Sequence, residues 1–226
     1  MRLQAWKPTA TEHSISLVLT CTAAILQLVA LSPRLGVTHL RSMANSTEFN
    51  LSDVIAVLIR TPPALDALLR GLPKTWSQRN EGTNTWSAFD IVGHLIVGDR
   101  TDWMPRARII LEHGEATPFH PFDRFAQEKE SRGMSLAQLL DEFARLRSEN
   151  VAALQSLNLQ SGDLMQRGTH PALGVVTLSQ LLATWAVHDL NHLHQLGRVM
   201  AHQYRNEVGP WSAYLGALHC VGHSAS

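Results

Sequence analysis

One stretch of this chain limits its possible folds more than any other, residues 177–204, TLSQLLATWAVHDLNHLHQLGRVMAHQY. Gln180 follows Thr177 at the spacing of a capping box, which marks the start of a helix. The apolar residues that follow recur at intervals of three and four, at Leu178, Leu181, Leu182, Trp185, Leu193, Leu196 and Val199. The pattern predicts one long helix whose apolar face packs against the rest of a bundle.

The face of this helix that should be buried also carries polar side chains. At 100° per residue, His188 and His192 lie about 40° apart, and Asn191 and Gln195 fall within roughly 60° of His188. Burying such groups without partners costs about 1–3 kcal/mol each. A metal ion is the explanation that we favour, whereas His194 points nearly opposite His192 and is expected to face solvent.

The composition of the chain fits one globular domain. Of its 226 residues 45% are apolar and 17% are charged, and 19 Lys and Arg balance 19 Asp and Glu. Without a basic field to attract phosphates, we expect no nucleic-acid partner. Cys21 and Cys220 form neither a disulfide framework nor a metal knuckle, so we expect a reducing, cytoplasmic location.

Residues 1–43 form an N-terminal extension that differs from the domain expected at 44–226. Residues 15–31 are an uncharged run that could anchor the chain in a membrane. About 17 residues is at the short limit for a span, and the run contains polar side chains. We therefore favour Met43 as the true start, and expect the body from about residue 50 to fold without the extension.

The first helix of the domain should begin at Asp53, with Ser52 as its cap. Pro62 and Pro63 lack the backbone N–H that helix interiors need. The sequence therefore predicts that this helix breaks there and restarts with Thr61 as a second cap.

Two further capping boxes, at Ser87 with Asp90 and at Ser135 with Gln138, open a second and a third helix. Pro105 should kink the second helix. The residues between these helices, 115–134, show no periodicity and are enough to cross the length of a bundle. The second and third helices can therefore run parallel, and a loop holding His170 leads to the fourth.

His94 on the second helix is the candidate for a third metal ligand, because open catalytic zinc sites usually have three protein ligands and a water. Asp90 lies one turn before it and Gly98 one turn after it. Asp90 either orients an imidazole or serves only the cap. Gly98 either leaves room for an ion and substrate or is a helix-packing contact.

Four capped helices, His94 in WSAFDIVGHLIVGDR, and the segment HPALGVVTLSQLLATWAVHDLNHLHQLGRV together resemble the DinB/YfiT-like superfamily. The resemblance covers about residues 50–204. It implies an all-α, up-down-down-up four-helix bundle with a long crossover between helices two and three, often dimeric. It also implies a divalent metal held by His94, His188 and His192, with water in the open position.

The function that the resemblance implies is a divalent-metal-dependent enzyme, with zinc or nickel as the expected ion. Its metal would activate a water or a thiol, for hydrolysis or for thiol S-transfer on a small molecule, because a bound cation lowers the pKa of both. A low-molecular-weight thiol is an expected cosubstrate and a homodimer the expected assembly. Asp90, Asn191 and Gln195 are candidates for the shell around the ligands.

Two other functions fit parts of the pattern. A zincin-like peptidase would need Glu after the first His of HDLNH, but Asp189 is one methylene shorter and lies about 100° from His188. A non-catalytic metal-binding or structural bundle, membrane-tethered through residues 15–31 in one version, would hold the histidines as satisfied core groups.

Overall fold

The computed structural model of the chain describes residues 48–220. Met43, the apolar run at 15–31 and the domain boundary near 43 lie outside the described residues, so these expectations stay predictions. Within 48–220, no helix combines the length and the apolar character that crossing a membrane requires.

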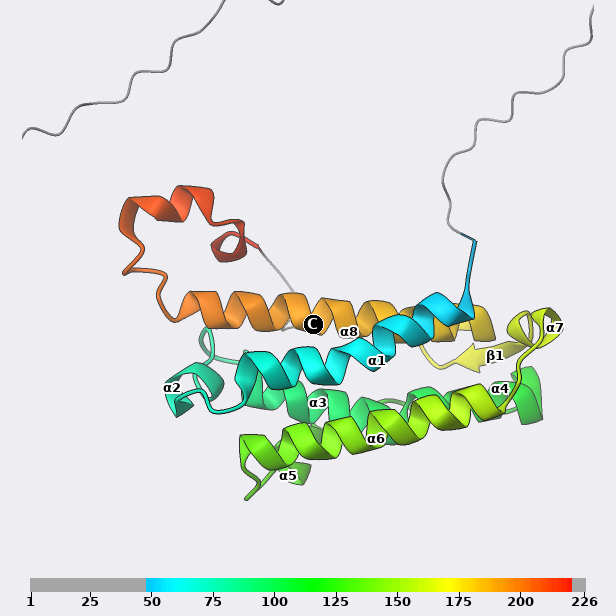
Figure 1. Ribbon diagram of the computed structural model, residues 1–226. Coiled ribbons are helices and arrows are strands. Elements are labelled where there is room, and N and C mark those ends of the chain that lie inside the picture. Colours follow the sequence, from blue (N-terminus) through cyan, green and yellow to red (C-terminus); the bar gives the residue numbers. More distant parts are fainter. Residues whose placement is uncertain (1–47, 221–226) are drawn as a thin grey trace, which may run out of the picture. The chain divides into compact units, whose positions relative to one another are not determined.

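Four long helical segments pack into a bundle, as Figure 1 shows. They are α1 (Leu51–Leu69), α3 (Ala88–Thr101) continued by α4 (Trp103–His113), α6 (Leu136–Ser156) and α8 (Leu178–His202). In the ribbon, α3 and α6 run in one direction, and α1 and α8 run in the other. The prediction of an all-α, up-down-down-up four-helix bundle is confirmed, and the crossover from α4 to α6 spans its length.

Short elements occupy the connections. They are α2 (Lys74–Ser77), η1 (Gly114–Ala116), α5 (Ala126–Glu130), α7 (Ser161–Leu164), β1 (Arg167–His170), β2 (Gly174–Thr177), η2 (Gly209–Tyr214) and η3 (Gly216–Leu218). Strands β1 and β2 pair antiparallel, with Arg167 opposite Thr177 and His170 opposite Gly174. A β-hairpin therefore stands where the sequence predicted only a loop.

The helix starts follow the capping pattern closely. All three predicted capping boxes form, at Ser87 with Asp90, at Ser135 with Gln138 and at Thr177 with Gln180. The first helix is the exception, because α1 begins at Leu51 and its cap is Asn50. The Asn50 side chain accepts a hydrogen bond from the backbone N–H of Ser52 at 2.9 Å. The cap is therefore Asn50, and the prediction of Ser52 as the cap is wrong.

The predicted break of the first helix at Thr61 is wrong, because α1 continues through Pro62 and Pro63. Pro62 has no N–H to donate to the carbonyl oxygen of Leu58, four residues earlier. Arg147 of α6 supplies that donor, with its Nη1 atom 3.1 Å from the Leu58 oxygen. A side chain of a neighbouring helix thus replaces the missing backbone hydrogen bond.

The second helix divides into α3 and α4 at Asp102, three residues before the predicted kink at Pro105. Asp102 stays in the right-handed region of backbone geometry, but its φ of −110° and ψ of −67° depart from regular helical values. The break places Pro105 in the first turn of α4, where a backbone N–H would have no partner within the helix. The helix is therefore interrupted at Asp102, before Pro105, and not at the proline itself.

The core has two apolar clusters separated by a polar layer. One cluster contains Trp103 and Trp185, whose rings stack at 5.8 Å, and the other contains Phe143 and Leu196. Between them along α3, α6 and α8 lie the charged or polar residues Asp99, Arg147, His188, Asp189 and His192. A bundle interior would normally exclude such groups, so this layer holds the candidate site.

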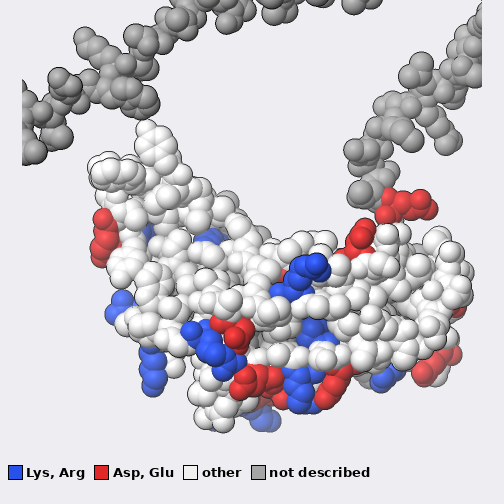
Figure 2. All heavy atoms as spheres, viewed as in Figure 1, with Lys and Arg blue, Asp and Glu red and all other residues white. Residues whose placement is uncertain are grey.

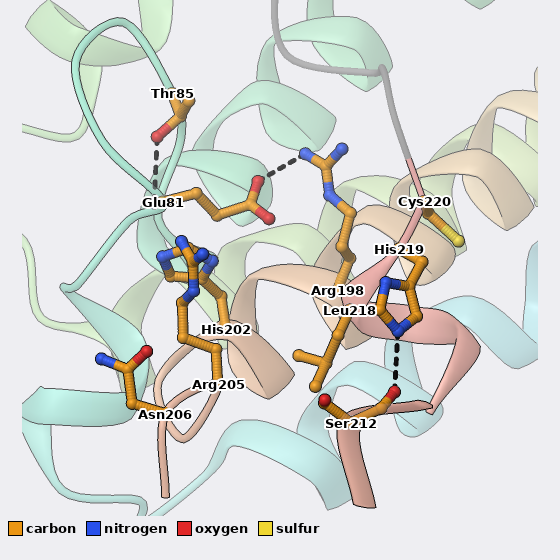
Figure 3. Close-up of a pocket in the computed structure, with 10 residues that line it drawn as sticks. All are labelled: Glu81, Thr85, Arg198, His202, Arg205, Asn206, Ser212, Leu218, His219 and Cys220. Carbon is orange, nitrogen blue, oxygen red and sulfur yellow. Dashed lines mark hydrogen bonds and ion pairs between the residues drawn. The ribbon is translucent and has the colours of Figure 1, made fainter. Parts of the chain in front are cut away.

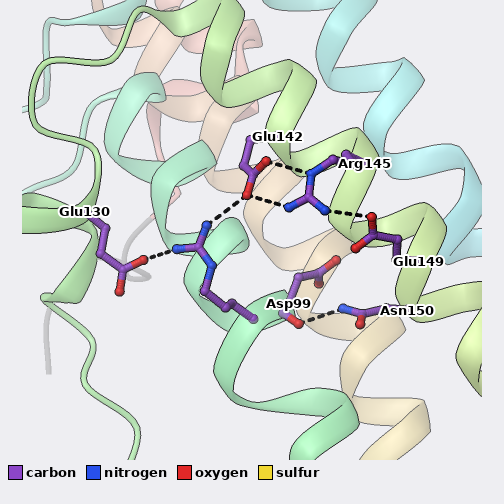
Figure 4. Close-up of polar contacts among 7 residues, drawn as sticks. Asp99, Glu130, Glu142, Arg145, Glu149 and Asn150 are labelled. Carbon is purple, nitrogen blue, oxygen red and sulfur yellow. Dashed lines mark hydrogen bonds and ion pairs between the residues drawn. The ribbon is translucent and has the colours of Figure 1, made fainter.

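Charges on the surface are mixed in sign. On the face shown in Figure 2, basic and acidic side chains intersperse. Figure 4 shows part of this pattern, where Arg145 binds both Glu142 and Glu149, at 2.9 Å and 2.6 Å. Exposed pairs of this kind contribute about 0–1 kcal/mol each, so the bundle depends on its interior.

Candidate metal centre

Three histidine side chains from two helices converge in the polar layer. The Nε2 atom of His188 lies 3.2 Å from Nε2 of His94 and 3.0 Å from Nε2 of His192. One ligand atom from each of the three residues lies within 4.8 Å of the others. Two nitrogens bound to one tetrahedral zinc at about 2.0–2.1 Å are roughly 3.3–3.4 Å apart, so these separations fit a shared ion.

Aromatic neighbours hold the imidazoles in place. The Trp86 ring lies 4.6 Å from the ring of His94, and the Trp103 ring lies 5.0 Å from that of His188, measured between centroids. A Cβ atom added at Gly98 would come within 3.2 Å of the Trp103 indole nitrogen. Gly98 is therefore a packing contact that lets Trp103 reach His188.

Gln195 fixes the protonation of one of the three rings. Its Oε1 atom lies 2.7 Å from Nδ1 of His192, and its side chain is fully buried. A carbonyl oxygen only accepts, so Nδ1–H of His192 donates to it and the lone pair is left on Nε2. That lone pair faces His188, which is the orientation that metal-binding histidines need.

The other two rings are neutral and lack partners at their outer nitrogens. The Nδ1 atoms of His94 and His188 are buried without a hydrogen-bond partner among the described residues. Loss of hydration, followed by the nearby His192, lowers the pKa of His94 to about 3 and that of His188 to about 2. Neutral imidazoles bind metals, so the donor set fits a divalent cation.

Lowering the pH is expected to destabilise the metal-free protein. The pKa of His94 is about 3 when folded, whereas an unfolded histidine titrates near about 6.5. Between these values the unfolded chain binds more protons, so the free energy of unfolding falls as the pH falls. From pH 7 to pH 5 one such ring costs about 2 kcal/mol. Urea unfolding at both pH values measures this loss, and an unchanged pH dependence in His94→Gln would contradict the assignment.

The other polar residues considered in the sequence differ in their contacts and in their exposure. The Asp90 carboxylate accepts hydrogen bonds from the backbone N–H and the hydroxyl of Ser87, at 2.8 Å and 2.6 Å, so it serves the cap of α3. Asn191 is partly buried and lines the cavity beside the histidines. His194 is exposed, as expected from its helix phase.

Asp189, the residue between the two α8 histidines, has another role. It is fully buried and forms an ion pair with Arg147, which also binds Asp99 through Nε at 2.7 Å and Nη2 at 2.9 Å. Burial raises the pKa of Asp99, and the Arg147 charge opposes that rise. Because Asp189 is directed to Arg147, it is not available as the general base of a zincin-like peptidase.

Sequence reasoning missed this buried ion network, although a signal for it exists. Arg147 lies four residues after Phe143 and four before Val151, both of them buried core residues of α6. A charged residue at the spacing of an apolar stripe indicates a buried partner of opposite charge.

The three histidines line one side of a cavity of about 950 Å³, which is large enough for a small-molecule substrate. The aromatic rings of Trp86, Trp103 and Phe122 contribute to its wall, together with the hairpin tip. A second cavity, of about 590 Å³, lies beside the C-terminal part of α8 and contains none of the three. Figure 3 shows its ion pair between Glu81 and Arg198.

Comparison with known proteins agrees with this architecture. YfiT from Bacillus subtilis, described as a probable metal-dependent hydrolase with an unusual four-helix bundle topology, is similar in structure. The TM-score is 0.57 and the identity 19%, over 79% of this chain and 94% of that chain. A search of the curated proteins found no match. The model of the DinB superfamily matches residues 57–196, which include His94, His188 and His192. The chain therefore belongs to the DinB superfamily.

Proposed function

We propose that this protein is a divalent-metal-dependent enzyme acting on a small molecule, by hydrolysis or by S-transfer from a thiol. The observation that carries the proposal is the convergence of three Nε2 atoms, with His188 at 3.0 Å and 3.2 Å from its two neighbours, on the wall of a cavity. Superfamily membership supports it.

His94, His188 and His192 would hold the ion, and zinc or nickel suits a site of three imidazoles. Neutral ligands leave a divalent cation its full charge, which favours the deprotonated form of a water or thiol near neutral pH. The protein contributes fixed ring orientations, through Gln195 on His192 and through the aromatic contacts of His94 and His188.

Among residues 48–220, those that line this cavity include neither cysteine nor lysine. A nucleophile from solvent or from a second substrate fits such a site, and hydrolysis and thiol transfer each supply one. The description of YfiT as a probable metal-dependent hydrolase supports the first of these reactions.

Adding a divalent metal to the chelator-treated full-length chain is expected to raise its melting temperature. An ion that binds the native state stabilises it by about 2.7 kcal/mol at one hundred times its dissociation constant. Melting curves with zinc, nickel and manganese, recorded without a histidine tag, measure the rise. Identical curves with and without all three metals would refute the proposal and favour a structural bundle.

A further inference from the structure

The tip of the β-hairpin holds one more histidine against the cavity. β1 ends at His170, and the turn closes at Gly174, whose φ of +74° favours glycine. Nδ1 of His170 accepts hydrogen bonds from the backbone N–H groups of Ala172 and Leu173, each at 3.1 Å. The ring also forms a T-shaped contact with Phe119. The imidazole is therefore held in one orientation.

These two hydrogen bonds determine where the ring carries its proton. A nitrogen that accepts from two N–H groups has no hydrogen of its own, so the neutral ring of His170 is protonated at Nε2. Partial burial, followed by the nearby Arg106, lowers the pKa of His170, in the direction that favours the neutral ring. His170 lines the same cavity as the three-histidine cluster, and its Nε2–H donates to no acceptor among the described residues.

The charges that line the cavity favour a negative ligand. Two cations, Arg106 and Arg124, and one carboxylate, Asp102, contribute to its wall. Asp102 is already paired with Arg106, with 2.6 Å between Oδ1 and Nε. Among the described lining residues, cations thus outnumber carboxylates by two to one, and the divalent metal of the proposed function would add positive charge. Charge of one sign in a cleft raises the local concentration of ligands of the opposite sign.

We propose that His170 is a substrate-binding residue whose Nε2–H donates to an anionic oxygen, such as a carboxylate, of a substrate that reacts at the three-histidine site. This inference rests on the proposed function and adds a substrate class to it. Small molecules with an oxyanion are bound in preference to neutral analogues.

His170→Asn distinguishes the proposed role from a purely structural one, in which His170 only caps the hairpin turn. A purely structural role predicts unchanged ligand binding in this variant. In His170→Asn the amide oxygen still accepts backbone N–H groups two residues on, as in an Asx-turn. The donor that the imidazole presents at Nε2 is lost. This variant therefore separates the turn cap from ligand binding, and an unchanged melting temperature verifies that the turn is intact.

The test uses full-length protein loaded with cobalt(II), whose thiolate charge-transfer absorption reports a bound thiol. The probes are mercaptoacetate, 3-mercaptopropionate and 4-mercaptobutyrate, compared with neutral 2-mercaptoethanol. We expect at least one acid to bind tenfold or more tightly than 2-mercaptoethanol. In His170→Asn this ratio should fall below threefold, with affinity for 2-mercaptoethanol unchanged, and His113→Asn, an exposed histidine at the end of α4, should behave as the parent.

The outcomes separate this inference from the proposed function. If thiols bind to the cobalt but acids have no advantage, or if His170→Asn keeps the full advantage, the role of His170 is refuted while the metal site stands. If cobalt does not bind at all, the proposed function fails and this inference fails with it.

Discussion

Replacing Arg147 with methionine is expected to lower the free energy of unfolding by about 3–5 kcal/mol, the cost of breaking a buried ion pair from one side. Its side chain is 2% exposed, and its guanidinium forms ion pairs with Asp99 and Asp189, whose side chains are both 0% exposed. Without Arg147 these carboxylates would face each other in the core, and the carbonyl of Leu58 would lose its donor. Chemical denaturation of the metal-free protein measures the loss.

Two further variants give this prediction its control. Arg145→Met removes a guanidinium from the same helix, but one that is half-exposed, so the expected loss is within about 1 kcal/mol. Replacing Arg147, Asp99 and Asp189 together by apolar residues of similar volume should recover much of the stability, because no buried charge remains. If Arg147→Met lowers the free energy of unfolding by less than about 1 kcal/mol, the prediction is wrong, and water or a rearranged side chain stabilises the carboxylates of Asp99 and Asp189 in place of Arg147.

Replacing His188 with alanine is expected to abolish the rise in melting temperature caused by metal, and to reduce metal affinity and activity by more than about 100-fold. Its Nε2 is the atom within 3.2 Å of both other imidazoles, so its loss leaves two separated ligands. Isothermal titration with zinc, together with melting curves, measures the change.

Matched variants on the same helix test whether the effect belongs to the site. His194→Ala, on the exposed face of α8, should bind metal as the parent does. Gln195→Ala removes the acceptor that orients His192, so it should lose about 10–100-fold in affinity. A His188→Ala protein that still responds fully to metal would show that the cation binds elsewhere.

Local rules predicted much of this architecture correctly. Capping boxes depend on residues three positions apart, so the starts of α3, α6 and α8 could be read from the sequence. Helix phase likewise placed His188, His192 and Gln195 on one face. The convergence of His94 with them is a long-range contact, and family resemblance, not spacing, indicated it.

The errors arose where distant residues compensate a local penalty. The sequence around Pro62 predicts a broken helix, because proline lacks a backbone donor. The donor that compensates for this loss comes from Arg147, 85 positions away along the chain, where local rules do not reach. The hairpin was missed because its strands have only four residues each and alternate weakly. The dimer, the thiol cosubstrate, the cytoplasmic location and the role of residues 1–43 stay predictions.

Thr177 is both the last residue of β2 and the cap of α8, so no linker separates the hairpin from the helix that carries His188 and His192. The pairing of Arg167 with Thr177 closes the base of the hairpin, and its tip, residues 171–173, borders the cavity. Evolutionary diversification of ligand preference is therefore expected at this tip, where side chains and loop length can change while the helix that presents the imidazoles keeps its place.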